Sequence, residues 1–215
     1  MKQILIVTAV DAERAAIERG IDAIGTQAAA NITLIAGGVG AASVAAATAE
    51  ALVREPHRVV VSAGIGGGFE GMAAIGALLV ADRIIAADLG AEDPQAPDGF
   101  ASVDSLGFGS AVVNARPIAA LARLGAVHGD LLTVNTVTGT AEGAARLMKR
   151  YPDAVGEAME GFGVAVAAAR FGVPAAEIRA VSNLVGPRNR DAWRIGDALA
   201  ALTAAVPALI EGLSS

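Results

Sequence analysis

Short runs of β-branched and aliphatic residues alternate with Ala-rich segments, and this alternation constrains the fold more than any other feature of the chain. ILIVTA (4–9), ITLIAGG (32–38) and RVVVSAG (58–64) have the composition of strands, and AASVAAATAEALVREP (41–56) that of a helix. Strands that alternate with helices indicate βαβ units. We therefore expect an α/β fold in which residues 1–215 form a single-domain three-layer sandwich, with a mixed, largely parallel central sheet between helices.

The second half of the chain continues this pattern after one long interruption. Residues 89–110 contain several Asp, Gly and Pro and predict a surface loop, of the kind that forms lids or oligomer contacts. After the loop we expect a helix from Arg116 to about Leu124. A strand, two helices, a strand and a final helix should follow in that order, over 130–137, 141–151, 154–171, 177–183 and 191–213.

Charge and composition exclude several classes of protein. The formal net charge of -6 argues against a non-specific binder of nucleic acid or of an anionic membrane. The absence of cysteine excludes thiolate nucleophiles and Cys-ligated zinc, and His57 and His128 have no partner at metal-ligand spacing. No apolar stretch lacks charges for long enough to span a bilayer. We expect a cytoplasmic protein with no nucleic-acid partner, membrane partner or metal site.

Glu13 follows the first predicted strand, in the first turn of the helix that begins at Asp11. In open α/β sheets the carboxyl ends of the strands form the ligand crevice, which makes Glu13 a candidate for chemistry. A carboxylate in this turn also stabilises the positive end of a helix. Position alone favours this capping interpretation.

Two glycine clusters follow predicted strands. AGGVGAAS (36–43) resembles a dinucleotide-binding turn, but Ser43 stands where the last glycine belongs, and the next strand ends without an acidic residue for a ribose. SAGIGGGF (62–69) is more unusual, because its glycines let a ligand approach the backbone and its N–H donors. A tight turn from strand to loop is the simpler alternative.

Two carboxylates lie three residues apart in EAMEGFG (157–163), which we expect to be helical, so both would lie roughly on one side of the helix. A carboxylate in an apolar segment is costly to bury unless something binds it. We expect Glu160 to be the buried, ligand-binding acid. Glu157 is expected to be a solvated acid near the start of the helix.

Polar residues follow the strand over 177–183. The amide of Asn183 can donate and accept a hydrogen bond to a ligand, or it can simply stabilise a turn after the strand. The loop GPRNRDAW (186–193) could present Arg188, Arg190 and Trp193 to a ligand as a lid, or it could be a solvated loop with a packed tryptophan.

The order of these features resembles the purine nucleosidase and nucleoside phosphorylase family over essentially the whole chain. TAVDAERAAI is similar to the family's acidic N-terminal turn, and SAGIGGGF to its Gly-rich turn. EAMEGFGVAVAAARFGVP is similar to its Met-Glu helix, and IRAVSNLVG to its strand that ends in Ser-Asp or Ser-Asn. TVNTVTGT (133–140) and SNLVGPRNRDAW (182–193) most resemble the branch that cleaves futalosine, on a route to menaquinone. The resemblance implies a homo-oligomeric hydrolase with a nucleoside phosphorylase-like fold and a small-molecule nucleoside substrate.

The resemblance also implies roles by position. Glu13 would activate the attacking water, and Glu160 would bind the ribose hydroxyls. The remaining implied contacts are with the sugar, the water or the base, and comprise Gly64, Ile65, Gly66, Val137, Thr138, Met159 and Phe162. Neither a metal nor an organic cofactor is implied.

Asn183 is the main departure from the adenine-specific members, which resemble this chain but have Asp there. An ionised carboxylate only accepts hydrogen bonds, which suits an amino group. An amide can donate to a 6-oxygen and accept from N7–H, so Asn183 points to hypoxanthine as the base. Beyond the 5′ carbon, Arg188 or Arg190 is the candidate to bind the substrate carboxylate, with Trp193 against its ring.

Three other functions remain open at this point. A 6-oxopurine nucleoside phosphorylase would need an oxyanion site of Arg and Gly, for which Arg14 is the only early arginine. A methylthioadenosine-type nucleosidase would release adenine instead. A non-catalytic nucleoside-binding protein is the alternative from another class, and the presence of Glu13, Glu160 and a polar base contact argues against it.

Overall fold

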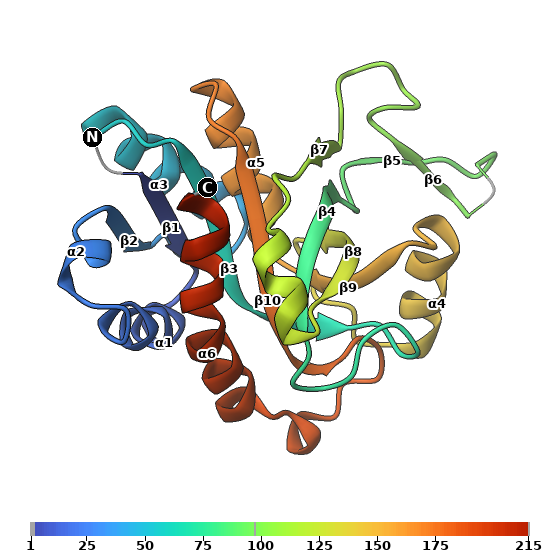
Figure 1. The fold of residues 1–215 in the computed structure, drawn as a ribbon. Helices are drawn as coiled ribbons and strands as arrows, with labels where there is room; N and C mark the ends of the chain where they lie inside the picture. Colours follow the sequence, from blue (N-terminus) through green and yellow to red (C-terminus); the bar gives the residue numbers. More distant parts are fainter. Residues whose placement is uncertain (1–2, 97, 215) are drawn as a thin grey trace.

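The computed structural model describes residues 3–96 and 98–214 (Figure 1). The strands are β1 (Ile4–Thr8), β2 (Ile32–Ala36), β3 (Val59–Gly68), β4 (Leu78–Ala86), β5 (Gly90–Glu92), β6 (Phe100–Ser102), β7 (Val112–Asn114), β8 (Val127–Thr133), β9 (Ala154–Ala158) and β10 (Ala175–Leu184). The α-helices are α1 (Asp11–Asp22), α2 (Thr26–Ala29), α3 (Ala41–Arg54), α4 (Ala141–Arg150), α5 (Gly161–Arg170) and α6 (Ile195–Ser214), and the 3-10 helices are η1 (Ala119–Leu124) and η2 (Arg190–Ala192).

The main sheet is mixed and largely parallel, as expected. Its strand order is β10-β4-β8-β9-β3-β1-β2, and β7 pairs with the second half of β4, at Arg83, Ile84 and Ile85. The strand β10 pairs with β3 as well as with β4, so that part of the sheet curls round and closes on itself. β3 is therefore central: its first half pairs with β1 and its last two residues pair with β9.

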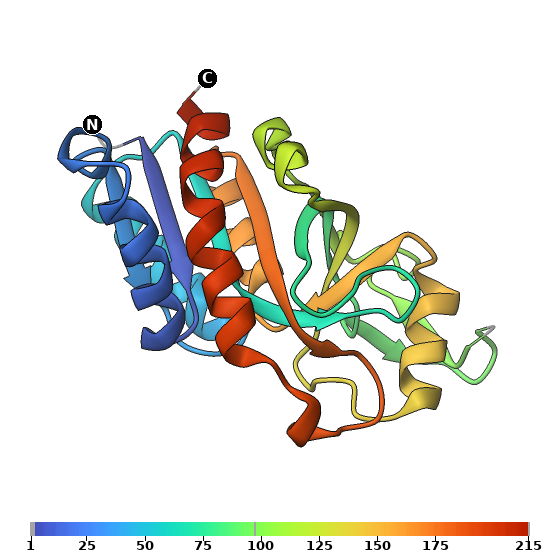
Figure 2. The ribbon, with the colours of Figure 1, turned by 60° about the horizontal axis from the view of Figure 1, so that its bottom comes forward.

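Helices cover both faces of this sheet and make the expected three layers. α1 and α6 lie side by side on one face, where they bury the cluster around Ile6, Val61 and Leu209 (Figure 2). α3 and α5 pack together on the other face, over the cluster around Leu5, Val60 and Val164. Both layers consist mainly of aliphatic and small side chains, which allow close approach of helix and sheet.

The structure corrects the prediction of one helix over 154–171. Residues 154–158 form the strand β9, which is inserted between β8 and β3, and the helix α5 begins only at Gly161. The Ala and Gly content of this segment hid the strand, because neither residue has a strong preference for it. Glu157 and Glu160 therefore do not share a helix face.

Two other expectations need smaller corrections. The glycines of residues 62–69 do not form a turn but continue β3 as far as Gly68, paired with β10. Residues 89–110 are not wholly irregular, because β5 and β6 pair there as a separate two-stranded sheet. Thr140 caps α4, with its Oγ1 accepting a hydrogen bond from Gly143 N at 3.0 Å.

The segment Arg190–Ser214, which contains α6, is long and apolar enough to cross a membrane by length and composition. This is weak evidence, because the core helix of a globular domain has the same properties. In this structure α6 packs against α1 and β10, and Leu202, Val206 and Leu209 are completely buried. Its apolar character is thus explained by the core.

Candidate active site

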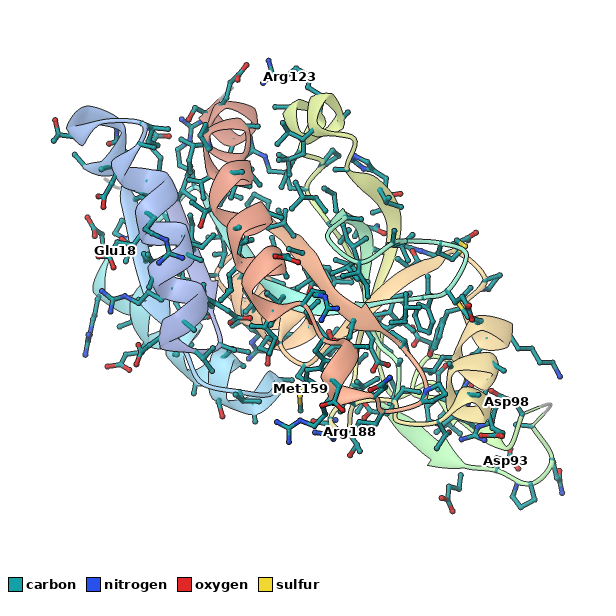
Figure 3. The ribbon with its side chains drawn as sticks, turned by 90° about the horizontal axis from the view of Figure 1, so that it is seen from below. Glu18, Asp93, Asp98, Arg123, Met159 and Arg188 are labelled. Atoms are coloured by element: carbon teal, nitrogen blue, oxygen red, sulfur yellow. The ribbon has the colours of Figure 1, made fainter. Side chains whose placement is uncertain are left out.

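A pocket of about 430 Å³ lies where the carboxyl ends of β1, β3, β9 and β10 meet. A cavity of this size is typical of small-molecule sites. Figure 3 looks onto this edge and labels Met159 and Arg188, which both line the pocket. The lining comprises Ala9, Val10, Glu13, Val39, Ile65, Gly66, Gly67, Val137, Thr138, Gly139, Glu157, Ala158, Met159, Glu160, Ser182, Asn183, Leu184, Gly186, Pro187, Arg188 and Trp193.

Glu13 is buried in the wall of this pocket and is fixed by three backbone groups. Its Oε2 accepts hydrogen bonds from Ala9 N at 2.9 Å and Val10 N at 3.3 Å. Its Oε1 accepts one from Ile65 N on β3 at 2.9 Å. The capping interpretation is therefore correct for one oxygen only. The other oxygen connects α1 to the glycine-rich end of β3.

Glu160 is also buried, at the junction between β9 and α5. Its Oε1 accepts a hydrogen bond from Gly40 N at 3.2 Å, and Gly40 is the residue that precedes α3. Its Oε2 accepts from Met159 N and from Arg179 Nη1, both at 3.3 Å. A carboxylate in this position is oriented from two sides and still faces the pocket.

Arg179 is the cation behind these two acids, and its side chain is only 1% exposed. Its Nε donates to Glu177 Oε1 at 2.8 Å and its Nη2 to Ser62 Oγ at 2.7 Å. Burial tends to lower the pKa of Arg179, but the charges of Glu177, Glu160 and Glu13 more than offset it, so that the pKa is raised. One arginine thus holds the carboxylates that surround it.

The glycines of β3 make this arrangement possible. A Cβ on Gly64 would lie 2.5 Å from Glu13 Oε1 and 2.6 Å from Arg179 Nη1. Both groups therefore occupy the space that any larger residue would need. A Cβ on Gly66 would likewise lie 2.7 Å from the carbonyl oxygen of Glu157.

Glu157 is not the solvated acid that we expected, because it is 5% exposed and lines the pocket. As a residue of β9 it points at the loop after β8, where Thr138 N and Thr138 Oγ1 each donate to its carboxylate at 2.7 Å. Burial raises the pKa of Glu157, although these two hydrogen bonds partly oppose the shift.

Asn183 lies at the end of β10 and lines the pocket. Its Oδ1 accepts a hydrogen bond from Ser182 Oγ at 2.8 Å, and its Nδ2 donates to Leu184 O at 3.0 Å. Ser182 Oγ also lies 3.2 Å from Gly66 O, which fixes the pair against β3. The amide therefore has a defined orientation rather than a free one.

The remaining predicted contacts divide into two groups. Gly66, Ile65, Val137, Thr138 and Met159 line the pocket, whereas Gly64 lies behind it under Glu13. Phe162 is not brought to the pocket. It packs against the core cluster that contains Val164, and its N–H donates to Thr133 Oγ1 at 2.9 Å.

The loop after β10 closes one side of the pocket. Arg188 and Trp193 line the pocket, with the Arg188 guanidinium 5.7 Å from the Trp193 ring centre. Arg190 lies 6.0 Å from the same ring but is not part of the lining. Arg188 N donates to Gly139 O at 3.3 Å, so this loop and the loop after β8 contact each other.

Sequence reasoning missed Glu157, Glu177 and Arg179. A signal for the last two was present, because opposite charges two residues apart in an apolar strand lie on one face of it and can pair. No comparable signal marked Glu157, because its segment was interpreted as a helix. Among the residues that the structure describes, no group of three or more acidic, His or Cys side chains is arranged to hold a metal ion.

The sequence matches a family model described as the phosphorylase superfamily over residues 11–213. It is 53% identical to a futalosine hydrolase of Streptomyces coelicolor, over 99% of this chain and 97% of that protein. It is 46% identical to a futalosine hydrolase of Acidothermus cellulolyticus, over 95% of this chain and 89% of that protein.

Solved structures share the fold at low sequence identity. A futalosine hydrolase of Helicobacter pylori superimposes with a TM-score of 0.79 at 15% identity, covering 98% of this chain and 97% of that one. A 5′-methylthioadenosine/S-adenosylhomocysteine nucleosidase of Colwellia psychrerythraea, solved with adenine, gives 0.79 at 20% identity, with 99% and 96% covered.

Proposed function

We propose, for this chain that belongs to the phosphorylase superfamily, that it hydrolyses the N-ribosidic bond of futalosine. The products are hypoxanthine and dehypoxanthine futalosine, and the step belongs to menaquinone biosynthesis. The observation that carries the proposal is the pair of buried carboxylates, Glu13 and Glu160, held by backbone N–H groups and Arg179 at the carboxyl edge of the sheet. Full-length relatives at 53% and 46% identity are futalosine hydrolases.

The proposed mechanism uses the negative charge of the pocket. As the purine departs, positive charge develops on the ribosyl ring, and fixed carboxylates stabilise such charge most effectively in a site that excludes water. Glu160 orients the ribose hydroxyls. Glu13 takes a proton from the attacking water, and general-base assistance of this kind typically contributes ~10²–10⁴-fold. We propose that neither a metal nor an organic cofactor is required.

Asn183 is proposed to bind the leaving base. Its amide donates to the 6-oxygen of hypoxanthine, and its oxygen accepts from N7–H after a solvent water has protonated N7 of the departing base. Binding a base in this way requires Nδ2 to exchange its bond with Leu184 O for one with the substrate. Val137 and Thr138 line the purine, and Ile65, Gly66 and Met159 lie beside the sugar.

Arg188 and Trp193 are proposed to bind the substituent beyond the 5′ carbon. Arg188 is the cationic side chain among the described residues that line the pocket, and a guanidinium suits the carboxylate of that substituent. Arg190 would act through the Trp193 ring that it approaches. Phe162 would reach the base only after leaving its present packing.

The position of Arg14 disfavours a phosphorylase. Its side chain is 43% exposed and pairs with Glu18 on the outer surface of α1 at 3.8 Å, so it supplies no phosphate site in the pocket. Arg179 is already surrounded by carboxylates. These carboxylates would repel an attacking phosphate anion, whereas they would not repel a neutral water molecule.

We also propose that the protein acts in the cytoplasm as a homo-oligomer. Three apolar residues at the edge of the pocket, Val39, Val137 and Leu184, are 53%, 39% and 41% exposed, and association would cover such surface. Light scattering coupled to size-exclusion chromatography would measure the mass, and a monomer at micromolar concentration would contradict the proposal.

Incubation of the protein with futalosine, with and without phosphate, tests the function. Chromatography identifies the released base. We expect hypoxanthine, released at a rate that does not depend on phosphate. A strict requirement for phosphate would instead indicate a phosphorylase. Preferential release of adenine from methylthioadenosine would indicate the adenine-specific activity, and tight binding without release would indicate a non-catalytic protein.

A further inference from the structure

Glu157 is a buried acid in the pocket to which the proposed mechanism gives no task. Its carboxylate is bound by Thr138 in the loop after β8, whereas Arg179 binds Glu160 and Glu177. Each of its oxygens accepts one hydrogen bond from Thr138. A carboxylate has about four lone-pair sites, so it retains capacity to accept from a ligand.

The strand pairing places Glu157 in a row with the base-binding residue. Asn183 of β10 is in register with Gly67 of β3, and Gly67 is in register with Glu157 of β9. Neighbouring strands are about 4.8 Å apart, so the Cα atoms of the outer two residues are separated by about 10 Å. All three residues line the pocket.

The middle position of this row has no side chain. A Cβ on Gly67 would lie 2.8 Å from Val185 Cγ2 and 3.4 Å from Asn183 Nδ2, so a larger residue would collide with its neighbours. Glycine leaves a flat floor between an amide on one side and a carboxylate on the other. Such a floor fits the edge of a planar ring that carries polar groups at both ends.

The two kinds of purine differ in what they would present to Glu157. A 6-oxopurine carries a hydrogen on N1, next to the 6-oxygen, and therefore offers a donor. A 6-aminopurine has a lone pair on N1, which an ionised carboxylate would repel. With Asn183 at N7 and the 6-oxygen, N1 is the next polar atom around the ring, on the side of Glu157.

We propose that Glu157 accepts a hydrogen bond from N1–H of the leaving base and so selects 6-oxopurines over 6-aminopurines. This inference rests on the proposed function and deepens it. Thr138 is a positioning residue in this arrangement, because its N–H and hydroxyl hold the carboxylate toward the ring. Specificity then comes from two polar contacts on opposite sides of Gly67.

Glu157→Gln tests the inference, with futalosine and its 6-amino analogue as substrates. Replacing the charged acceptor with a neutral amide weakens the hydrogen bond from N1–H and is expected to lower kcat/KM for futalosine about 10- to 100-fold. The value for the 6-amino analogue should stay the same or rise, because an amide can donate to N1. Glu142→Gln makes the same chemical change on the exposed first turn of α4 and should leave both values unchanged.

An equal loss of kcat/KM for both substrates would overturn the inference. It would mean that Glu157 only fixes the position of Thr138 in the pocket lining and does not contact the base. Unchanged selectivity in a variant that still cleaves futalosine would overturn it as well and would leave the proposed function intact.

Binding of free bases separates the inference from the function. By calorimetry, the wild-type protein should bind hypoxanthine more tightly than adenine, and Glu157→Gln should reduce this preference at least about tenfold. If futalosine is not cleaved but this result holds, the proposed function falls and the inference stands.

Binding of 1-methylhypoxanthine keeps the inference testable if the variant does not fold. The methyl group removes the N1–H donor, so wild-type protein should bind this base at least about tenfold more weakly than hypoxanthine. Glu157→Ala, which vacates the space beside N1, should recover its binding. Equal binding of the two bases by the wild-type protein would overturn the inference.

Discussion

At the level of single residues, the pocket is defined by carboxylates whose positions are fixed by backbone N–H groups. Glu13 receives three such bonds and Glu160 two, and Arg179 joins Glu160 to Glu177. Carboxylates that are already fixed in place stabilise the positive charge of the transition state without first having to move.

Glu13→Gln is expected to lower kcat by about 10²- to 10⁴-fold, because an amide cannot take the proton from water. KM for futalosine should change little, since Glu13 is proposed to contact the water and not the base. Steady-state kinetics measures both values, and Glu142→Gln is the matched control. A Glu13→Gln variant with full kcat would remove Glu13 from the mechanism.

Asn183→Asp is expected to shift the preference of the enzyme from 6-oxo to 6-amino nucleosides. The new carboxylate would face the lone pairs of the 6-oxygen, which should lower kcat/KM for futalosine about 10- to 100-fold. The same carboxylate accepts from a 6-amino group, so the ratio of the two kcat/KM values is the quantity to measure. An unchanged ratio would assign base selection to other residues.

Sequence reasoning at this scale placed Glu13 in the first turn of a helix after a clear strand, where the structure also has it, and the role of Glu13 stays a prediction. It placed Glu160 and Asn183 at positions that the structure brings to one pocket, although their roles stay predictions. It was wrong about the burial of Glu157, because burial depends on strand pairing far along the chain. Pairing of β9 with both β8 and β3 cannot be inferred from five residues of low strand preference.

At the level of elements, the end of β3 controls the site. Its glycines pair with β10 on one side and β9 on the other while side chains from neighbouring elements fill the space above them. The sequence indicated that this cluster was unusual, and it suggested a turn. Two neighbouring strands instead keep the segment extended, and this is a property of the assembled sheet.

Gly64→Ala is expected to impair both stability and catalysis. The added Cβ would lie 2.5 Å from Glu13 Oε1 and 2.6 Å from Arg179 Nη1, so these groups must move. Overpacking of this kind typically costs about 1–3 kcal/mol of unfolding free energy. We also expect kcat to fall at least about tenfold, because small displacements of catalytic groups are costly.

Gly196→Ala is the matched control for that experiment. A Cβ on Gly196 would meet nothing within 4 Å, and this residue lies at the exposed start of α6. Denaturant unfolding and kinetics of the two variants should therefore differ clearly. Equal stability and equal kcat would show that the space above Gly64 is not constrained.

At the level of the whole molecule, several buried carboxylates make the native state sensitive to pH. Burial raises the pKa of Glu157 and of Glu177 above their usual range in the folded protein. The folded state then binds more protons than the unfolded state at pH values between the usual and the raised pKa. Stability therefore falls as pH rises through that window, and the loss is complete above the raised pKa.

Glu157→Gln removes one of these groups, so the variant should lose less stability than the wild-type protein as pH rises from the ordinary pKa of a glutamate through the raised pKa of Glu157. The difference in unfolding free energy between variant and wild type should therefore grow with pH in favour of the variant. Denaturant unfolding at a series of pH values measures it. A constant difference, matching that of Glu142→Gln, would mean that the ionisation of Glu157 is not coupled to folding.

The overall architecture was predictable because its signals are distributed over the chain. Alternating apolar and Ala-rich segments specify a largely parallel sheet between helices, and no single error changes that result. Closure of the sheet through β10, which pairs with both β3 and β4, was not predictable. It depends on which strand ends meet in space, and the site is built where they meet.

The central claim is that water attacks the ribosyl carbon when the base leaves. It is tested most directly by running the reaction in water enriched in ¹⁸O, with phosphate present, and analysing the ribosyl product by mass spectrometry. The account predicts dehypoxanthine futalosine that carries one ¹⁸O atom, together with free hypoxanthine. A phosphorylated ribosyl product without ¹⁸O from the solvent, or no release of hypoxanthine from futalosine, would contradict it.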